Sequence, residues 1–444
     1  MAQTAEIQQT MPKAGAERRS GLVGLRAALA AAAGNLLEWY DFTVYAYFAI
    51  LIGKAFFPGA DATTALVQAF LTFGLGFLVR PAGAVLMGAY ADRHGRKAAL
   101  TATILLMAAG TLVIALAPPA SAIGIGAPLL LVAGRSLQGF SAGGEVGGAL
   151  TFMVEHAPPG RRGLYASLLQ ASMAGSNVLG SLVGFALTSL LAPAELAAWG
   201  WRVAFLIGVL IAPVGLWLRR TLGETPEFSA LAASAPRPSL SAAARAAFAR
   251  PGRLLAATGL STLWTAGSYA LAIYFPIYVQ AVGKASPRSA FAASLTGSVV
   301  LVFACLAGGR LADRIDRRLL LTAVAVMLAV VPHFLLRGAL ASPDLATLTL
   351  VQSAICLMVG LFNGAAPSAL AALFPVGSRA SGTSVGYNLA VMLFGGFAPT
   401  ILTWLIGRGL VFAPAWYVSA AALLSLPALF VLAPCEPPLS SAAP

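Results

Sequence analysis

Charged side chains are scarce in this sequence of 444 residues. Asp, Glu, Lys and Arg together make up 10% of the chain, whereas hydrophobic residues make up 59%. A soluble domain carries about 25% charged residues, so this composition argues against a soluble protein and is typical of a membrane protein. Cysteine is scarce too: Cys305, Cys356 and Cys435 are far apart, with no metal-ligand or redox spacing. We interpret them as small apolar side chains.

The sequence also lacks the motifs of several enzyme classes. It has no G-x-x-x-x-G-K-[ST] phosphate-binding loop, no nucleophile–base arrangement and no metal-ligand pattern. Its first twenty residues contain no apolar stretch of the signal-peptide type, so we expect the first hydrophobic segment to direct membrane insertion. The sequence therefore indicates neither an enzyme nor an ATP-driven pump, and we expect no cofactor and no metal.

Long apolar runs are abundant instead. A membrane-spanning helix needs about 20 mostly apolar residues, and cutting the chain at charged or Pro/Gly-rich joints gives twelve such segments. They lie near Arg26–Gly53, Thr64–Tyr90, Ala98–Ala117, Ala127–Val154, Leu164–Ala192, Trp201–Leu218, Leu254–Val282, Ser289–Leu311, Leu319–Leu340, Leu345–Phe374, Gly382–Ile406 and Val411–Leu432. The pattern predicts an all-α polytopic membrane protein with twelve transmembrane helices.

The loops between these segments differ in charge. Twenty of the 28 Lys and Arg residues fall on the side that holds both chain ends, six fall on the other side and two lie within spans. Because loops rich in Lys and Arg stay in the cytoplasm, we predict cytoplasmic N- and C-termini. The formal net charge of +13 then reflects this bias, and we expect no nucleic-acid partner.

The two halves of the chain repeat a motif. "GAYADRHGRK" (Gly88–Lys97) joins spans two and three, and "GRLADRIDRR" (Gly309–Arg318) joins spans eight and nine. Two six-helix halves on a common plan are typical of a large transporter class. We therefore divide the chain into a cytoplasmic tail (1–25), an N-terminal half (26–220), a cytoplasmic linker (221–253), a C-terminal half (254–433) and a second cytoplasmic tail (434–444).

The first span carries two carboxylates, in "GNLLEWYDF" (Gly34–Phe42). Glu38, Asp41 and Tyr45 are spaced i, i+3 and i+7 and share one helical face. A charge inside a span indicates a functional site by default. Two carboxylates this close in a low dielectric are not both readily ionised, so we expect Asp41 and Glu38 to take part in carrying a proton. The alternative is that one acid permanently neutralises an arginine.

The other three ionisable groups well inside spans are Arg80, Arg135 and Glu145. We expect Arg135 to pair with ionised Asp41 and to be freed for a substrate carboxylate when Asp41 is protonated, since the guanidinium fork suits a carboxylate. A fixed salt bridge between the two helices is the alternative. Arg80 either binds a second substrate carboxylate or pairs with Glu145, which we interpret as structural or gating.

Several stretches together resemble a known family. The loop Gly88-x-x-x-Asp92-Arg93-x-Gly95-Arg96-Lys97, repeated in the second half, resembles the signature loop of the major facilitator superfamily. "GNLLEWYDF", "FGLGFLVRPAGAVLMG" (Phe73–Gly88), "GRSLQGFSAGGE" (Gly134–Glu145), "EHAPPGRRG" (Glu155–Gly163) and "SGTSVGYNLAVMLFGGFAP" (Ser381–Pro399) resemble its metabolite:proton symporter family. That family includes porters for citrate, tricarballylate, 2-oxoglutarate, shikimate and proline/betaine. The resemblance implies the twelve-helix major facilitator fold and transport driven by the proton gradient.

Two groups of residues complete the expected site. Polar residues of the spans can bond a substrate; we expect this of Arg135, Arg80, Tyr45, Gln138, Asn35, Tyr274, Asn363 and Asn388. Residues near the inner ends of the spans are expected to form a gate: Asp92, Arg93, Arg96, Glu145, Glu155, Arg162, Asp313, Arg314 and Arg317. Asp92 can pair with neighbouring arginines or cap span eleven near Ser381–Ser384; the alternative is a set of solvated charges that only set the topology.

The sequence thus predicts a monomeric bacterial inner-membrane transporter that imports a small organic acid by proton symport. Its expected partners are an anionic small molecule, protons and membrane lipids. The fifth span lacks the GPxxGG stretch associated with proton antiporters of the superfamily, which favours uptake over export. Uptake of a zwitterion such as proline or betaine is the alternative, and a nutrient receptor without turnover is a third reading.

Overall fold

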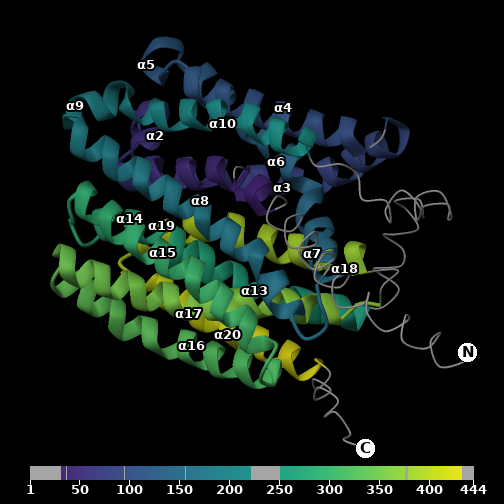
Figure 1. Ribbon diagram of the computed structural model, residues 1–444. Coiled ribbons are helices and arrows are strands. Elements are labelled where there is room, and N and C mark those ends of the chain that lie inside the picture. The colour runs from purple at the N-terminus through teal and green to yellow at the C-terminus, as the bar shows by residue number, and fades with distance from the viewer. Residues whose placement is uncertain are drawn as a thin grey trace, which may run out of the picture.

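The computed structural model describes residues 32–36, 38–94, 96–155, 157–221, 251–375 and 379–432. These residues are almost entirely helical and include no strand. The helices form two groups that lie side by side, one from each half of the chain (Figure 1). The predicted tails 1–25 and 434–444, and most of the predicted linker 221–253, lie outside the described residues.

The N-terminal group begins with a first span that is helical over residues 32–36 and 38–47 and continues, after a turn at Phe48, as α2. Its helices are α2 (Ala49–Phe56), α3 (Ala62–His94), α4 (Arg96–Leu116), α5 (Ala120–Ile123), α6 (Gly126–Ser141), η2 (Ala142–Gly144), α7 (Glu145–Glu155), α8 (Arg162–Leu190), α9 (Pro193–Glu195), η3 (Leu196–Gly200) and α10 (Trp201–Thr221).

The C-terminal group has the same plan. Its helices are α13 (Pro251–Ala266), η4 (Gly267–Ile273), α14 (Phe275–Ala281), α15 (Pro287–Ala312), α16 (Arg317–Ala341), α17 (Leu345–Ala372), α18 (Arg379–Ala390), η6 (Val391–Gly396), α19 (Ala398–Gly407) and α20 (Ala413–Phe430). The prediction of an all-α protein with twelve membrane-spanning helices is confirmed, and most helix ends lie within a few residues of the predicted ends. Eight of the described segments are long and apolar enough to cross a membrane.

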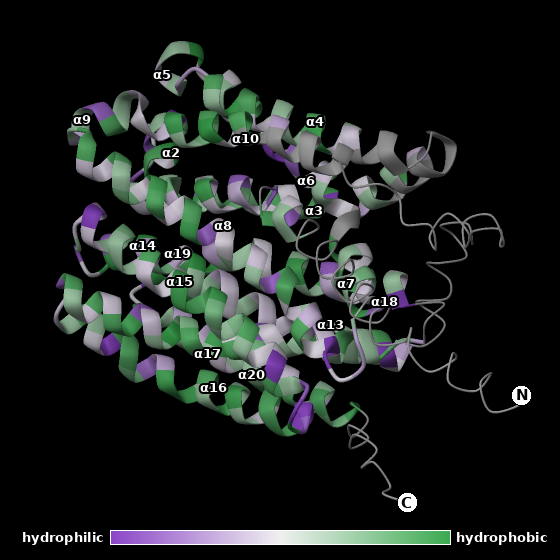
Figure 2. Cartoon of the chain, viewed as in Figure 1, coloured by the Kyte–Doolittle hydropathy of each residue, from purple (hydrophilic) through white to green (hydrophobic). Residues whose placement is uncertain are grey.

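The outer surface fits a lipid environment. Large apolar side chains point away from the protein, among them Leu210, Leu350 and Phe334, which are 73%, 69% and 65% exposed. Figure 2 shows hydrophobic residues along the helices and hydrophilic residues mostly near helix ends. Because lipid tails are as apolar as these side chains, their exposure costs little in a membrane. The chain is a multi-pass membrane protein.

Several spans are interrupted, which the hydropathy pattern did not predict. A 3₁₀ turn (η2) divides span four. Two π-helical segments, η4 and η6, divide spans seven and eleven, and a proline follows shortly after each of these two segments. Pro276 has no N–H to bond the carbonyl of Ala272, four residues earlier; that carbonyl accepts a hydrogen bond from Gln352 Nε2 at 3.1 Å instead. A neighbouring helix therefore compensates for the break.

Glycines let α3 and α6 approach closely. A Cβ atom on Gly139 would lie 1.8 Å from the Gly76 carbonyl oxygen, and a Cβ on Gly83 would lie 1.9 Å from the Phe140 carbonyl oxygen. Small residues at such crossings allow backbone-to-backbone packing in membranes. The crossing brings the arginine of α3 next to the arginine of α6, and this proximity builds the site described next.

Candidate functional site

Arg80, on α3, is a buried cation without a hydrogen bond. It is 2% exposed, and none of its three guanidinium nitrogens has a hydrogen-bond partner among the described residues. Aromatic rings surround the guanidinium instead: its central carbon lies 4.5 Å from the ring centre of Phe77, 4.9 Å from Phe42 and 5.1 Å from Trp39. Cation–π contacts attract the charge, yet they leave its N–H groups free to bind an anion.

Arg135, on α6, lies on the other side of the same aromatic cluster. Its guanidinium carbon is 4.6 Å from the ring centre of Phe42 and 4.7 Å from those of Tyr45 and Phe73. Nη1 donates to Gln138 Oε1 at 2.7 Å and Nη2 donates weakly to the Phe73 carbonyl at 3.4 Å, whereas Nε has no partner. The site thus contains two buried guanidinium groups with Phe42 next to both.

Asp41, on the first span, is the buried carboxylate of the site. Its Oδ2 accepts a hydrogen bond of 2.5 Å from the Thr111 hydroxyl of α4, and its Oδ1 is buried without a hydrogen-bond partner among the described residues. On the opposite side α10 approaches so closely that a Cβ on Gly208 would lie 2.2 Å from Oδ1. Glu38, one turn earlier, is only half-buried.

The expected direct pair of Asp41 and Arg135 is not made in this conformation; no ion pair joins these two described residues. A chain of hydrogen bonds joins them instead. Arg135 Nη1 donates to Gln138 Oε1, Gln138 Nε2 donates to Thr111 Oγ1 at 2.9 Å, and Thr111 donates to Asp41. The exchange between Asp41 and a substrate at Arg135 remains a prediction.

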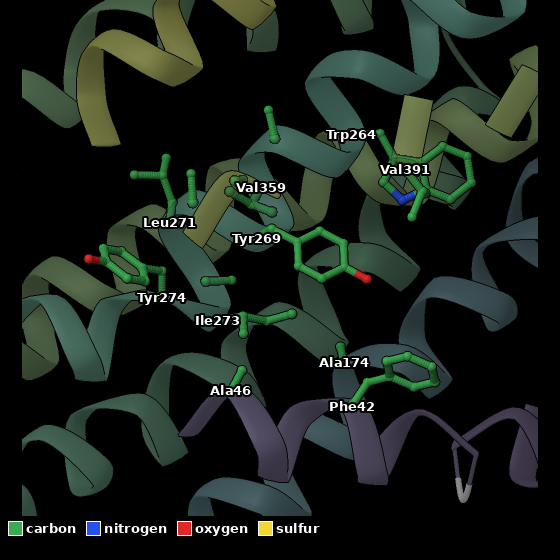
Figure 3. Packing of buried hydrophobic residues seen from close by; sticks show 14 of the residues in the cluster. Phe42, Ala46, Ala174, Trp264, Tyr269, Leu271, Ile273, Tyr274, Val359 and Val391 are labelled. Atoms are coloured by element: carbon green, nitrogen blue, oxygen red, sulfur yellow. The ribbon is translucent and has the colours of Figure 1, made fainter. Parts of the chain in front are cut away.

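A cavity lies between the two halves, next to this cluster. The residues that line it come from spans one, five, seven, eight, ten and eleven: Trp39, Gln170, Met173, Ala174, Asn177, Trp264, Thr265, Ser268, Tyr269, Ile273, Leu301, Cys305, Asn363 and Tyr387. Figure 3 shows the ring of Tyr269 reaching from the C-terminal half toward Phe42 and Ala174 of the N-terminal half. Trp39 lines the cavity and also packs against Arg80, whereas Arg80, Arg135 and Gln138 themselves are not among the lining residues.

Two polar atoms near the cavity lack partners. The hydroxyl of Tyr269 and Oδ1 of Asn363 are buried without a hydrogen bond among the described residues, while Asn363 Nδ2 donates to Ser268 Oγ at 2.8 Å. The halves also meet at the cavity wall, where Trp264 Nε1 donates to Gln170 Oε1 at 2.7 Å. Buried polar groups usually have partners, so both unpaired atoms are suited to bind a ligand.

Other residues expected to bind substrate lie outside the cavity lining. Asn35 donates to Ser172 Oγ at 2.8 Å, and the Tyr45 hydroxyl donates to the Ala69 carbonyl at 3.0 Å. The Tyr274 hydroxyl is bonded to Thr403 Oγ1 at 2.8 Å. Asn388 Nδ2 makes long contacts of 3.4 Å with the Gly143 carbonyl and Ser384. In this conformation these four side chains link helices.

The inner end of the molecule carries contacts between the halves. Asp313, at the C-terminus of α15, accepts hydrogen bonds from the backbone N–H groups of Gly163 and Leu164 at 2.6 and 2.9 Å. Glu155 and Arg379 form an ion pair of 3.3 Å. These contacts fit the expected gating role of Asp313 and Glu155.

The structure describes the remaining expected gate residues only in part. Arg317 Nη1 donates to the Ser368 carbonyl at 3.4 Å. Arg162 begins α8, and Arg314 follows α15. Four expected residues lie on described helices while their side chains lie outside the description: Asp92, Arg93, Arg96 and Glu145. The choice between substrate and Glu145 as the partner of Arg80 therefore stays open.

Sequence reasoning missed Thr111, Trp39 and Trp264. Thr111 is one of three threonines in an apolar span, and threonine in such a position usually bonds only its own helix. The two tryptophans could have been found from the sequence. Tryptophan in membrane proteins favours the interface with water, so Trp39 and Trp264 are unusual because they lie within spans. Their side chains form part of the cavity wall.

Comparison with known proteins agrees with this architecture. Residues 27–237 match the family described as "Sugar (and other) transporter". The solved structure of a D-xylose-proton symporter superposes with a TM-score of 0.71 at 18% identity, covering 92% of this chain and 97% of that one. Similarity at this identity shows the shared fold.

Relatives are similar over nearly the whole chain. The citrate-proton symporter of Salmonella typhi is 36% identical over 419 residues, covering 94% of this chain and 95% of the relative. The glycine betaine/proline/ectoine/pipecolic acid transporter OusA of Dickeya dadantii (strain 3937) is 33% identical over 431 residues, covering 94% of this chain and 85% of the relative. The similarity thus extends to relatives with different substrates.

Proposed function

Because this chain belongs to the major facilitator superfamily of transporters and to its metabolite:proton symporter family, we propose that it carries a small organic acid together with protons. The substrate class is a di- or tricarboxylate such as citrate, tricarballylate or 2-oxoglutarate. The direction is import, through alternating access of the two halves around the central cavity. The name of the Salmonella typhi relative supports the first substrate.

One observation carries the proposal: Arg80 is buried, and none of its guanidinium nitrogens has a hydrogen-bond partner among the described residues. An unpaired buried ion costs several kcal/mol, and arginine cannot lose its proton to avoid that cost. A bound carboxylate would satisfy the planar fork with two parallel hydrogen bonds. Arg135, next to the same ring of Phe42, keeps Nε free for a second carboxylate.

Asp41 is the proposed proton carrier. Its ionised form adds a negative charge that is linked to Arg135 through Gln138 and Thr111 and that competes with an incoming anion. Protonation removes this charge, so substrate should bind more tightly as the pH falls through the titration of Asp41. Coupling then follows from linkage, because a group that is protonated more readily in the bound state takes up a proton on binding.

Contacts between the halves at the inner end support alternating access. Asp313 and Glu155 each join one half to the other, and such polar contacts can break when the halves rock. We also propose that the protein is a monomer in a bacterial inner membrane with both termini in the cytoplasm, as the distribution of basic loops indicates. Reporter fusions to each terminus test the orientation.

A binding screen tests the substrate class. Purified protein is titrated with citrate, tricarballylate, 2-oxoglutarate, shikimate, proline and betaine, and the melting temperature is followed. Stabilisation by a di- or tricarboxylate that is lost in Arg80→Gln supports the proposal. Stabilisation by proline or betaine alone contradicts it. A ligand that binds but is not taken up into liposomes would indicate a nutrient receptor.

One feature favours a zwitterion as the second candidate. Four aromatic side chains line the cavity: Trp39, Trp264, Tyr269 and Tyr387. Aromatic cages recognise quaternary ammonium groups by cation–π attraction, and a single arginine would bind the carboxylate of betaine. Trp264→Leu separates the two candidates, because it should abolish betaine binding and reduce citrate binding much less.

A further inference from the structure

We propose that Thr111, together with Gln138, is a positioning residue for proton coupling: its hydroxyl transmits the protonation state of Asp41 to Arg135. This inference rests on the proposed function, because it requires a proton at Asp41 and a substrate anion at Arg135. Neither Thr111 nor Gln138 needs to exchange a proton with solvent. Each needs only to change the direction or strength of a hydrogen bond.

The four residues form one unbroken chain across three spans. Arg135 Nη1 to Gln138 Oε1 is 2.7 Å, Gln138 Nε2 to Thr111 Oγ1 is 2.9 Å, and Thr111 Oγ1 to Asp41 Oδ2 is 2.5 Å. All four are buried; Arg135 and Gln138 are 0% exposed and Asp41 is 4% exposed. In a low-dielectric interior the hydrogen bonds of such a chain polarise one another.

The Thr111 hydroxyl has two acceptors for its single hydrogen. Besides Asp41 Oδ2, the Met107 carbonyl of its own helix lies 2.9 Å from Oγ1. A hydroxyl can donate once and accept twice. While Asp41 is ionised, Thr111 donates to it and accepts from Gln138. When Oδ2 carries a proton, Asp41 donates to Thr111, and the hydroxyl hydrogen turns to Met107. In both states the Thr111 hydroxyl donates one hydrogen bond and accepts from Gln138.

The two protonation states of Asp41 differ in how strongly the hydrogen-bond chain holds the guanidinium of Arg135. With Asp41 ionised, every donor in the chain points from the cation toward the anion, so the dipoles align and hold the guanidinium on Gln138. With Asp41 protonated, the hydroxyl of Thr111 is reversed and the alignment ends there. Arg135 Nη1 is then held less strongly, and the guanidinium can turn to a substrate carboxylate. The chain therefore replaces the direct ion pair as the link between proton and substrate.

The surroundings of Asp41 contain few other groups that could carry this signal. On the packed helices α4 and α10, the nearest groups are Thr111 and Gly208, which carry no charge. Among the described residues, the charged or titratable groups near Asp41 are Tyr40 and Glu38 on its own helix and Arg135 on α6, while Arg80 on α3 contacts the ring of the adjacent Phe42. The Tyr40 hydroxyl donates to the Ala204 carbonyl at 3.0 Å, so it is engaged elsewhere.

The test compares Thr111→Val with Thr111→Ser in liposomes and in binding assays with citrate. Thr111→Val keeps the shape and removes the hydroxyl, whereas Thr111→Ser keeps the hydroxyl. One linked proton should make wild-type affinity change by up to about tenfold per pH unit where Asp41 titrates. We expect this change to fall below about threefold in Thr111→Val and to return in Thr111→Ser. The ionisation of citrate is common to all variants and cancels between them.

Controls separate this inference from a structural effect and from the proposed function. Thr262→Val removes another buried hydroxyl, whose one hydrogen-bond partner among the described residues is the Thr258 carbonyl of its own helix, and it should keep the wild-type pH dependence. If Thr111→Val does not fold, Gln138→Met cuts the same chain at the next bond and should give the same loss. The inference is overturned if Asp41→Asn loses the pH dependence of citrate affinity while Thr111→Val or Gln138→Met keeps the pH dependence of the wild type. If Asp41→Asn also keeps wild-type coupling, the proposed proton site itself is wrong.

Discussion

Asp313 caps a helix of the opposite half: its carboxylate accepts hydrogen bonds from the backbone N–H groups of Gly163 and Leu164 at the start of α8. The first N–H groups of a helix have no partner within it, and a carboxylate there also meets the positive end of the helix dipole. A Cβ on Gly163 would lie 2.8 Å from Asp313 Oδ1 and 2.3 Å from the Gly309 carbonyl oxygen. The two halves therefore meet here without room for a side chain.

Removing this cap should open the inner end. We expect Asp313→Ala to raise the rate at which Cys305, in the cavity wall, is alkylated by a thiol reagent, in protein whose other two cysteines are replaced by alanine. The increase should be about tenfold or more, because a hydrogen bond to a charged group contributes about 1.5–3 kcal/mol and about 1.4 kcal/mol corresponds to a factor of ten.

Asp316→Ala is the matched control for this effect. Asp316 lies three residues later but caps its own helix, accepting from Arg318 N at 2.7 Å and Leu319 N at 3.2 Å. Its loss should lower the melting temperature without changing the alkylation of Cys305. Equal alkylation rates in the two variants would show that Asp313 does not hold the halves together.

Gly208→Ala should impair transport. The added Cβ would lie 2.2 Å from Asp41 Oδ1, so the carboxylate or α10 must shift, and we expect the hydrogen bond of Asp41 with Thr111 to weaken. We expect uptake into liposomes to fall by more than about tenfold while overpacking costs about 1–3 kcal/mol of stability. Gly338→Ala, on α16, meets nothing within 4 Å and should behave like the wild type. Unchanged uptake in Gly208→Ala would mean that the position of Asp41 is not critical.

Arg80→Met should separate stability from binding. The empty protein should gain stability, because exchanging an unpaired buried charge for an apolar side chain of similar length removes a desolvation cost of several kcal/mol. Substrate affinity should fall by about two orders of magnitude or more, since truncating one partner of a buried charge pair costs about 2–5 kcal/mol. Melting temperature and citrate affinity are measured on the same preparation.

Arg288→Met is the control for Arg80→Met. Arg288 lies at the exposed start of α15, 5.7 Å from the ring centre of Phe185, and its replacement should change neither quantity. A lower melting temperature of the empty Arg80→Met protein would indicate that Arg80 has a stabilising partner, and the observation behind the proposed function would lose its force.

Asp344 should give the stability of α17 a pH dependence. It lies in the loop before α17, and hydrogen bonds from the backbone N–H and the hydroxyl of Thr347, and from the N–H of Ala346, lower its pKa below the usual value. A lowered folded-state pKa gives stability that is present above the unfolded-state pKa and is lost as the pH falls through the folded-state pKa. Asp344→Ala should therefore melt earlier than the wild type at neutral pH, with a difference that shrinks below about pH 4. A difference that is constant with pH would contradict this role.

The sequence by itself determined the architecture of this protein. Twelve apolar runs of spanning length fix the helices, because a backbone in lipid must satisfy its hydrogen bonds within each segment. The repeat of Asp92 by Asp313 indicated two related halves. The sequence also identified Asp41, Arg80 and Arg135 as candidate site residues, because a charge within an apolar span is too costly to remain without a function.

Tertiary structure decided which of these groups meet. Periodicity places Asp41 and Arg135 on faces of their own helices but does not set the rotation and depth of one helix against another. The close approach of α4 and α6, where a Cβ on Gly110 would lie 2.6 Å from the Gly134 carbonyl oxygen, places Thr111 next to Gln138, between the two charges. Helix packing likewise turned Asn35 and Tyr274 toward neighbouring helices and brought Trp39 and Trp264 to one cavity. Hydrogen-bond partners lie far apart in the chain, so only packing could select them.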